Sequence, residues 1–204
     1  NNILKSSEFD VKTILVGNIA AGGTGKTPHV EYLIRLLSNK KLATLSRGYG
    51  RKDPGFQQAN KESTADSIGD EPLQFYTKHP EVNVFVDTSR VSGIIGIMSK
   101  EEIPEVVLLD DAFQHRSLKT GFSILLTDYN APFYKDFMLP TGNLREFTRG
   151  KKRADVIIVS KCPSVLSDAE KQQITEKIDA SPEKKVFFTT VKYGSFNSPF
   201  NLEE

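Results

Sequence analysis

The chain has 204 residues, of which 38% are hydrophobic, and this is enough for one sizeable core, or for a full domain and part of a second. Its 27 basic and 26 acidic side chains give a net charge of +1, so the overall charge favours no nucleic-acid partner. The single cysteine, Cys162, excludes an internal disulfide and a cysteine-based zinc cluster, and favours a reducing compartment. No apolar run approaches the roughly 20 residues that span a bilayer, and there is no signal-peptide pattern. We therefore expect a soluble, cytosolic protein, with surface attachment to a membrane left open.

Short apolar runs bounded by turn residues predict the strands. They are β-branched and largely unalternating, as strands buried on both faces are. The runs cover residues 13–16, 42–45, 82–86, 106–109, 122–126, 156–159 and 186–188.

Helical patterns lie between several of these runs. Val30, Leu33, Ile34 and Leu37 follow the i, i+3, i+4, i+7 spacing, and Ser167 with Glu170 has the form of a capping box before a stretch that ends near residue 178. Alternating strands and helices predict an α/β fold with a doubly wound, mostly parallel sheet and right-handed crossovers.

Two segments interrupt this alternation. Residues 48–67 are polar and rich in turn residues, which predicts a long surface loop over the sheet edge. Residues 141–153 are loop-like and basic, which predicts a boundary. We therefore expect a P-loop core domain over 1–148, and part of a second, smaller α/β lobe with its strand linker over 149–204.

The stretch AAGGTGKTPH, residues 20–29, follows the first predicted strand and precedes the first predicted helix, as a phosphate-binding loop does. Glycines there let backbone N–H groups turn toward phosphate oxygens, and the helix amino terminus adds a favourable dipole. The lysine would reach the β- and γ-phosphates, and the threonine after it would ligate magnesium. A plain glycine-rich turn with a solvated lysine is the weaker interpretation, although Ala20 replaces the usual first glycine. The predicted nucleotide-binding residues are Gly22, Gly23, Thr24, Gly25, Lys26 and Thr27.

Two aspartates, Asp110 and Asp111, end the run VVLLDD, at the carboxyl end of a predicted buried strand. Open α/β sheets bind ligands at that edge, so these carboxylates would hold magnesium directly or through water. A strand end followed by a solvated turn is the alternative. Gln114 and His115 follow at once, and a structural role for this histidine is as plausible as a functional one.

Two further segments end or begin predicted elements near the same edge. In SRGYG, Arg47 could clamp phosphate and Tyr49 could stack on a ring, or both could belong to a surface turn. In IGDEP, Asp70 and Glu71 open a helix, where acids are expected for capping alone.

The same segments differ from those of two other classes of P-loop protein. Partitioning ATPases of the deviant Walker type carry a lysine where this chain has Ala21, so their dimer-dependent chemistry is not expected. GTPase switches usually have Asp-x-x-Gly after the second motif strand, whereas this chain reads DDAF at 110–113. A guanine-reading Asn-Lys-x-Asp is approximated only by SKCP at 160–163. A nucleotide-dependent switch or regulatory module remains the alternative from another functional class.

The ordered series GNIAAGGTGKTPH, SRGYG, GDEP, LLDDAFQH and LPTGNLRE closely resembles the tetraacyldisaccharide 4′-kinases of lipid A biosynthesis. These motifs run from Gly17 to Glu146, and the pattern continues into ADVIIVSK. That family also departs from the strict phosphate-loop pattern at its first glycine, so Ala20 is a family-like variant of a working site.

The resemblance implies a kinase that uses ATP and Mg²⁺ to phosphorylate the 4′-hydroxyl of a tetraacylated disaccharide 1-phosphate, an acylated phospholipid. It implies a peripheral enzyme at the cytoplasmic face of the bacterial inner membrane. Carried over by position, Lys26, Asp111 and Asp70 would be catalytic, with Asp70 as the general base. Magnesium would be surrounded by Thr27, Asp110, Asp111 and Glu146. The substrate-binding positions would be Arg47, Tyr49, Gln114, His115 and Arg145.

The chain departs from the family pattern at both ends. Members usually begin with an amphipathic or hydrophobic helix, and they extend into a second lobe whose His-containing motif supplies a partner for the aspartate base. Neither His29 nor His79 matches that motif. We therefore expect a truncated chain that binds nucleotide and transfers phosphate poorly.

A cluster of basic residues lies at the carboxyl-terminal end of the last of these motifs and just after it. It could contact the substrate's 1-phosphate or anionic lipid headgroups, where each positive charge contributes about 1 kcal/mol. A solvated loop is at least as good an interpretation. The cluster comprises Arg145, Arg149, Lys151, Lys152 and Arg153.

Overall fold

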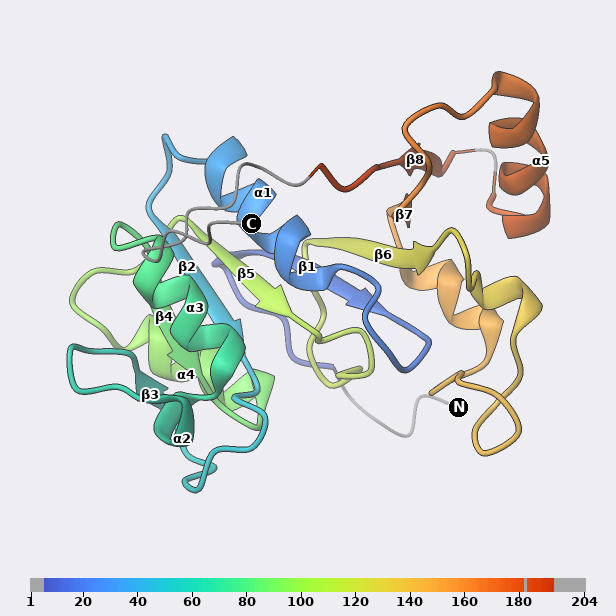
Figure 1. Ribbon diagram of the computed structural model, residues 1–204. Coiled ribbons are helices and arrows are strands. Elements are labelled where there is room, and N and C mark those ends of the chain that lie inside the picture. Colours follow the sequence, from blue (N-terminus) through green and yellow to red (C-terminus); the bar gives the residue numbers. More distant parts are fainter. Residues whose placement is uncertain (1–5, 182, 193–204) are drawn as a thin grey trace, which may run out of the picture.

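The computed structural model describes residues 6–181 and 183–192. Its centre is an eight-stranded sheet with the order β3-β4-β2-β5-β1-β6-β7-β8 (Figure 1). All neighbouring strands are parallel except β3 and β4, which are antiparallel. The strands are β1 (Lys12–Asn18), β2 (Leu42–Ser46), β3 (Gln57–Gln58), β4 (Asn83–Val86), β5 (Val106–Asp110), β6 (Phe122–Asp128), β7 (Val156–Ser160) and β8 (Lys185–Phe188).

The central strands are buried on both faces, as their unalternating apolar sequences predict. Along β5, Val107 and Leu109 belong to one hydrophobic cluster, whereas Val106 and Leu108 belong to another. Because successive side chains of a strand point to opposite faces, the two clusters are the two covered sides of the sheet. The predicted doubly wound α/β architecture is confirmed.

Helices cover both sides. α1 (Lys26–Leu36) contributes Val30 and Ile34, and α3 (Asp70–Lys78) contributes Phe75, to one cluster. α4 (Arg90–Met98) contributes Ile94 and Ile97 to the other. The chain also forms a single turn, α2 (Ala65–Ile68), and two 3₁₀ segments, η1 (Phe133–Lys135) and η2 (Thr148–Arg153).

The last helix begins where its sequence signal lies. α5 (Asp168–Ile178) has Ser167 as its N-cap, and the side chains of Ser167 and Glu170 bond each other's backbone N–H groups in a capping box. α5 and β8 lie together at the outer edge of the sheet (Figure 1).

Residues 149–192 contribute β7 and β8 to the same sheet as the phosphate-loop core. The division into domains at residues 148 and 149 stays a prediction, and its part over residues 193–204 lies outside the described residues.

Residues 48–67, expected to be one long loop, carry two short elements. β3 pairs with β4 through Gln57 and Gln58, and α2 begins at Ala65. The segment predicted as a long surface loop over the sheet edge thus contains an edge strand and the start of a helical turn. The strand was missed because a two-residue antiparallel pairing leaves no periodic signal in a polar sequence. Residues 141–153, also expected to be loop-like, end in η2. In the part of the chain that the structure describes, no helix is both long and apolar enough to span a bilayer.

Candidate active site

The phosphate loop connects the carboxyl end of β1 to the amino end of α1. Gly22 and Gly25 have backbone φ angles of 108° and 80°, values that residues other than glycine rarely adopt. Ala20 has no such requirement, because it lies in an extended bridge with Leu144, and Ala21 donates its N–H to the carbonyl of Asn143. Alanine is therefore compatible with the first position of this loop, whereas Gly22 and Gly25 supply its turns.

Buried polar side chains brace the loop from beneath. Asn18 Nδ2 donates to Thr24 Oγ1 at 2.9 Å, and Ser160 Oγ, at the end of β7, donates to the carbonyl of Thr24 at 2.8 Å. The Thr24 hydroxyl is thus directed into the protein, where Thr24 is 5% exposed. The Thr24 N–H is also engaged, since it donates to the carbonyl of Gly22 at 3.1 Å. A contact between Thr24 and phosphate would require one of these bonds to open.

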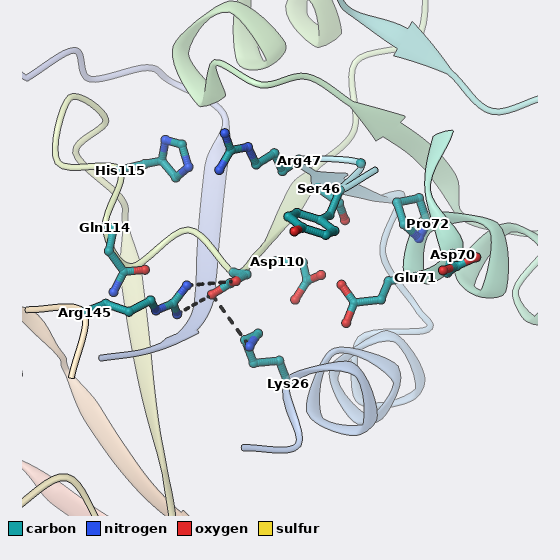
Figure 2. A pocket seen from close by; sticks show the side chains of 13 residues that line it. Lys26, Ser46, Arg47, Asp70, Glu71, Pro72, Asp110, Gln114, His115 and Arg145 are labelled. Carbon is teal, nitrogen blue, oxygen red and sulfur yellow. Dashed lines mark hydrogen bonds and ion pairs between the residues drawn. The ribbon is translucent and has the colours of Figure 1, made fainter. Parts of the chain in front are cut away.

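A cleft of about 670 Å³ opens beside the loop (Figure 2). Every predicted catalytic residue and every predicted substrate-binding residue lines it, although they come from five separate sequence motifs. Its lining comprises Lys26, Ser46, Arg47, Gly48, Tyr49, Asp70, Glu71, Pro72, Asp110, Asp111, Gln114, His115 and Arg145.

Asp111 is held as an anion by two cations. Arg145 donates from Nη2 to Oδ1 at 2.8 Å and from Nη1 to Oδ2 at 3.2 Å, and Lys26 Nζ lies 3.8 Å from Oδ1. Burial raises the pKa of Asp111, but the hydrogen bonds from Arg145 and the charges of Lys26, Arg145 and Arg90 together lower it. Asp111 therefore stays charged at neutral pH and orients Lys26 within the cleft.

Asp110 is in a different environment although it is the adjacent residue. It is 1% exposed, and its Oδ1 has no hydrogen-bond partner among the described residues. Burial, followed by the charges of Glu71 and Asp111, raises its pKa to about 7. Two neighbouring carboxylates with pKa values shifted in opposite directions are typical of a functional site.

Arg90 lies beneath this pair, and no sequence pattern had identified it. It is 1% exposed, and its guanidinium donates to the carbonyls of Asp87 at 2.9 Å and Asp110 at 2.8 Å. Burial lowers its pKa to about 10, which still leaves it charged at neutral pH. Arg90 thus joins the chain following β4 to the end of β5.

Glu71 is the second residue that the sequence did not assign to the site. Figure 2 shows its carboxylate directed toward Asp110, while Asp70 lies farther from that pair at the edge of the view. The Thr27 hydroxyl donates to Glu71 Oε1 at 3.1 Å, although 44 positions separate the two residues. An acid in the first turn of a helix is expected for capping alone, so nothing in the sequence indicated that Glu71 belongs to the site. Its role follows only from the folded structure, in which α3 brings Glu71 to Thr27 of α1.

Glu146, predicted to surround magnesium, does not line the cleft. Both of its carboxylate oxygens accept from Arg153 Nη2, at 2.9 and 2.8 Å, and Oε1 also accepts from Gln114 at 3.0 Å. The remaining cleft residues differ in exposure, and Ser46, Gly48 and Pro72 are buried. Tyr49 is 87% exposed, and burial, with the nearby charges of Arg90 and Arg47, lowers the pKa of His115.

The donors beside the phosphate loop suit magnesium. They are the hydroxyl of Thr27 and the carboxylates of Glu71, Asp110 and Asp111, and all of them are oxygen ligands, which Mg²⁺ prefers. The described residues contain no cluster of three or more His, Cys, Asp or Glu side chains that would enclose a metal alone. Mg²⁺ usually takes one or two carboxylates from the protein and completes its shell with water and substrate phosphates.

Comparisons with known proteins support the kinase family that the sequence motifs resemble. The family model "LpxK: Tetraacyldisaccharide-1-P 4′-kinase" matches residues 1–196. A tetraacyldisaccharide 4′-kinase of Flavobacterium johnsoniae is 54% identical over 94% of this chain and 56% of its own length. One of Bacteroides thetaiotaomicron is 49% identical over 97% of this chain and 52% of its own length. The chain thus spans about half the length of these curated relatives.

A solved structure is also similar. The "apo" form of LpxK from Aquifex aeolicus in complex with ATP superposes with a TM-score of 0.74 at 35% identity, over 92% of this chain and 56% of the other. Sequence, fold and cleft agree, and the alternative of a P-loop switch outside this family is set aside. The chain belongs to the tetraacyldisaccharide 4′-kinase family.

Proposed function

We propose that this chain carries the nucleotide site and the phosphoryl-transfer site of an ATP-dependent lipid kinase that phosphorylates the 4′-hydroxyl of a tetraacyldisaccharide 1-phosphate. The observation that carries this proposal is the convergence, in one cleft, of Lys26 with the carboxylates of Asp70, Asp110 and Asp111. Family membership and the likeness to a relative solved with ATP support the choice of substrates.

Phosphoryl transfer is mainly a matter of positioning and charge neutralisation. The N–H groups of the phosphate loop and the ammonium group of Lys26 would hold the ATP phosphates, while Asp111 and Arg145 keep that lysine in place. Asp70, at the solvent-accessible side of the cleft, would accept the proton of the acceptor hydroxyl. The oxygen then bonds to the γ-phosphorus, and the bond from that phosphorus to the β–γ bridging oxygen of ATP breaks.

Magnesium, held by Thr27, Asp110 and Asp111 with Glu71 alongside, would neutralise charge on the phosphates. Arg47, Tyr49, Gln114 and His115 line the remaining walls, and they would bind the acceptor. Because the acceptor is an acylated lipid, we place the whole protein at the cytoplasmic face of the bacterial inner membrane.

The test is transfer of labelled γ-phosphate from Mg-ATP to a tetraacyldisaccharide 1-phosphate in detergent micelles. This chain would be compared with a version extended to the length of its relatives, and with Asp70→Asn in that extended version. We expect transfer by the extended protein and a large loss with Asp70→Asn, while ATP binding is kept. Absence of transfer by the extended protein, with ATP binding intact, would refute the proposal.

A further inference from the structure

Two buried polar atoms of residues that line the cleft have no hydrogen-bond partner among the described residues. They are Ser46 Oγ, at the end of β2, and Asp110 Oδ1, at the end of β5. Ser46 is 3% exposed and Asp110 is 1% exposed, so bulk water satisfies neither atom. A buried polar group without a partner destabilises the folded state, and two of them in one cleft therefore indicate a functional arrangement.

The sheet places these two residues side by side (Figure 2). β2 and β5 are parallel neighbours in which Leu45 pairs with Leu109, so Ser46 and Asp110 follow at the same step of the two strands. Residues at the same step point to the same face of the sheet, which here is the face covered by α1 and α3. On its other side Ser46 pairs with Val86 of β4, whose side chain has no polar atom. Asp110 is therefore the polar side chain beside Ser46 on the two neighbouring strands.

The two carboxylate oxygens of Asp110 differ in their surroundings. Within the part of the chain that the structure describes, only Oδ1 is both enclosed and without a partner. A carboxylate that ligates a metal is itself usually held by hydrogen bonds, which fix its orientation. Ser46 offers the matching group, because a serine hydroxyl can rotate and donate one hydrogen bond.

We propose that Ser46 is a positioning residue for magnesium. Its hydroxyl donates to Asp110 Oδ1 in the loaded site, and this bond keeps the other oxygen, Oδ2, available to the metal. Ser46 thus acts through Asp110 and does not itself contact the metal or the substrates. The inference rests on the proposed function, since it takes Mg-ATP as the bound species.

Thr44 provides a matched control on the same strand. Its hydroxyl is also buried and without a partner among the described residues, and it lies two positions before Ser46 on the same face. It pairs with Leu108 of β5 and Val84 of β4, however, and it does not line the cleft. Thr44→Val therefore removes a buried hydroxyl that has no carboxylate beside it on either neighbouring strand.

The test measures ATP binding to the extended protein by calorimetry, with Mg²⁺ and then without it in the presence of a chelator. The ratio of the two Kd values gives the contribution of magnesium. We expect Ser46→Ala to reduce this ratio about tenfold, as for the loss of a group that orients a metal ligand. Kd for ATP without Mg²⁺ should not change. Ser46→Cys, which has only a weak donor, should behave like Ser46→Ala, and Thr44→Val should leave the ratio unchanged.

A double variant tests whether Ser46 acts through Asp110. Ser46→Ala should add nothing to the loss that Asp110→Asn causes, whereas additive losses would overturn the proposal. An unchanged ratio for Ser46→Ala, an equal loss with Thr44→Val, or a wild-type protein whose ATP binding does not respond to Mg²⁺ would also overturn it. If the wild-type protein binds Mg-ATP but transfers no phosphate, the proposed function fails separately, and the ratio still decides the role of Ser46.

Discussion

His29 joins the phosphate loop to the chain that follows the last strand. Its Nδ1 lies 2.7 Å from the carbonyl oxygen of Gly25, the N-cap of α1, and its Nε2 lies 3.2 Å from the hydroxyl of Thr189. The two contacts require opposite roles of a neutral ring, with Nδ1 donating to the carbonyl and Nε2 accepting from the hydroxyl. Burial lowers the pKa of His29 and favours this neutral form.

We expect His29→Ala to weaken ATP binding by up to about thirtyfold, because both contacts are lost and each hydrogen bond contributes roughly 1 kcal/mol. Thr189→Val removes the second contact only, so its effect on the dissociation constant should be smaller. The measurement is ATP binding by calorimetry, with melting temperatures as a check on folding. If Thr189→Val weakened binding as much as His29→Ala, the contact with Gly25 would have no role of its own.

Lys26→Ala should lower kcat by about 10²–10³-fold, the loss expected when one charge-stabilising donor is removed from a phosphoryl-transfer site. Asp111 would keep its bidentate contact with Arg145, so the fold should survive. Phosphate transfer by the extended protein measures the effect, and Lys177→Ala, an exposed lysine on α5, is the control. An unchanged rate for Lys26→Ala would exclude the proposed role of the loop.

Asp110→Asn should raise the melting temperature at pH 8 in the absence of magnesium and nucleotide. The increase in melting temperature should be smaller at pH 5. The pKa of Asp110 is raised by burial, and by Glu71 and Asp111, from 3.8 to about 7. The folded state therefore holds this proton more tightly than the unfolded state. The resulting stabilisation is complete below the unfolded pKa and is lost as the pH rises through about 7. Asparagine carries no charge at either pH, so it avoids the cost that the buried carboxylate incurs at pH 8.

Melting temperatures at the two pH values measure this difference. Asp111→Asn is the matched control, because the pKa of Asp111 is lowered and its charge is paired with Arg145. That variant should destabilise the protein at both pH values. Equal shifts for Asp110→Asn at pH 5 and pH 8 would contradict the assignment of the raised pKa.

Ala20→Gly should leave ATP binding nearly unchanged, whereas Gly22→Ala should weaken it about tenfold. A Cβ at Gly22 would meet no atom within 4 Å, so only its backbone, with φ at 108°, opposes the substitution. Such a conformation costs a non-glycine residue roughly 1–3 kcal/mol. The dissociation constant for ATP, measured on both variants, shows whether backbone strain at Gly22 or the lack of a glycine at position 20 matters for the loop. A larger loss with Ala20→Gly than with Gly22→Ala would show that the first position governs the loop.

Much of the site could be predicted because its parts are local in the sequence. The phosphate loop requires a strand, glycines, a lysine and a helix in immediate succession, and all of them lie within 12–36. The strand end at Asp110 and Asp111 was predictable for the same reason, since a buried apolar run followed by acids places carboxylates at the ligand edge of a parallel sheet. The ordered motifs then identified the family.

Contacts between distant segments were decided only by the tertiary structure. Glu71 reaches Thr27, Ser160 supports Thr24, and Arg90 holds the carbonyl of Asp110 across 20 positions. In the sequence these residues are an ordinary helix acid, a strand-end serine and a helix arginine. The sequence alone determined the phosphate loop, the parallel strands and the family, because short-range periodicity and motif order specify them. The tertiary structure decided which carboxylate has a raised pKa, which arginine is buried and which acid joins the site, because burial and charge neighbours exist only once the chain is folded.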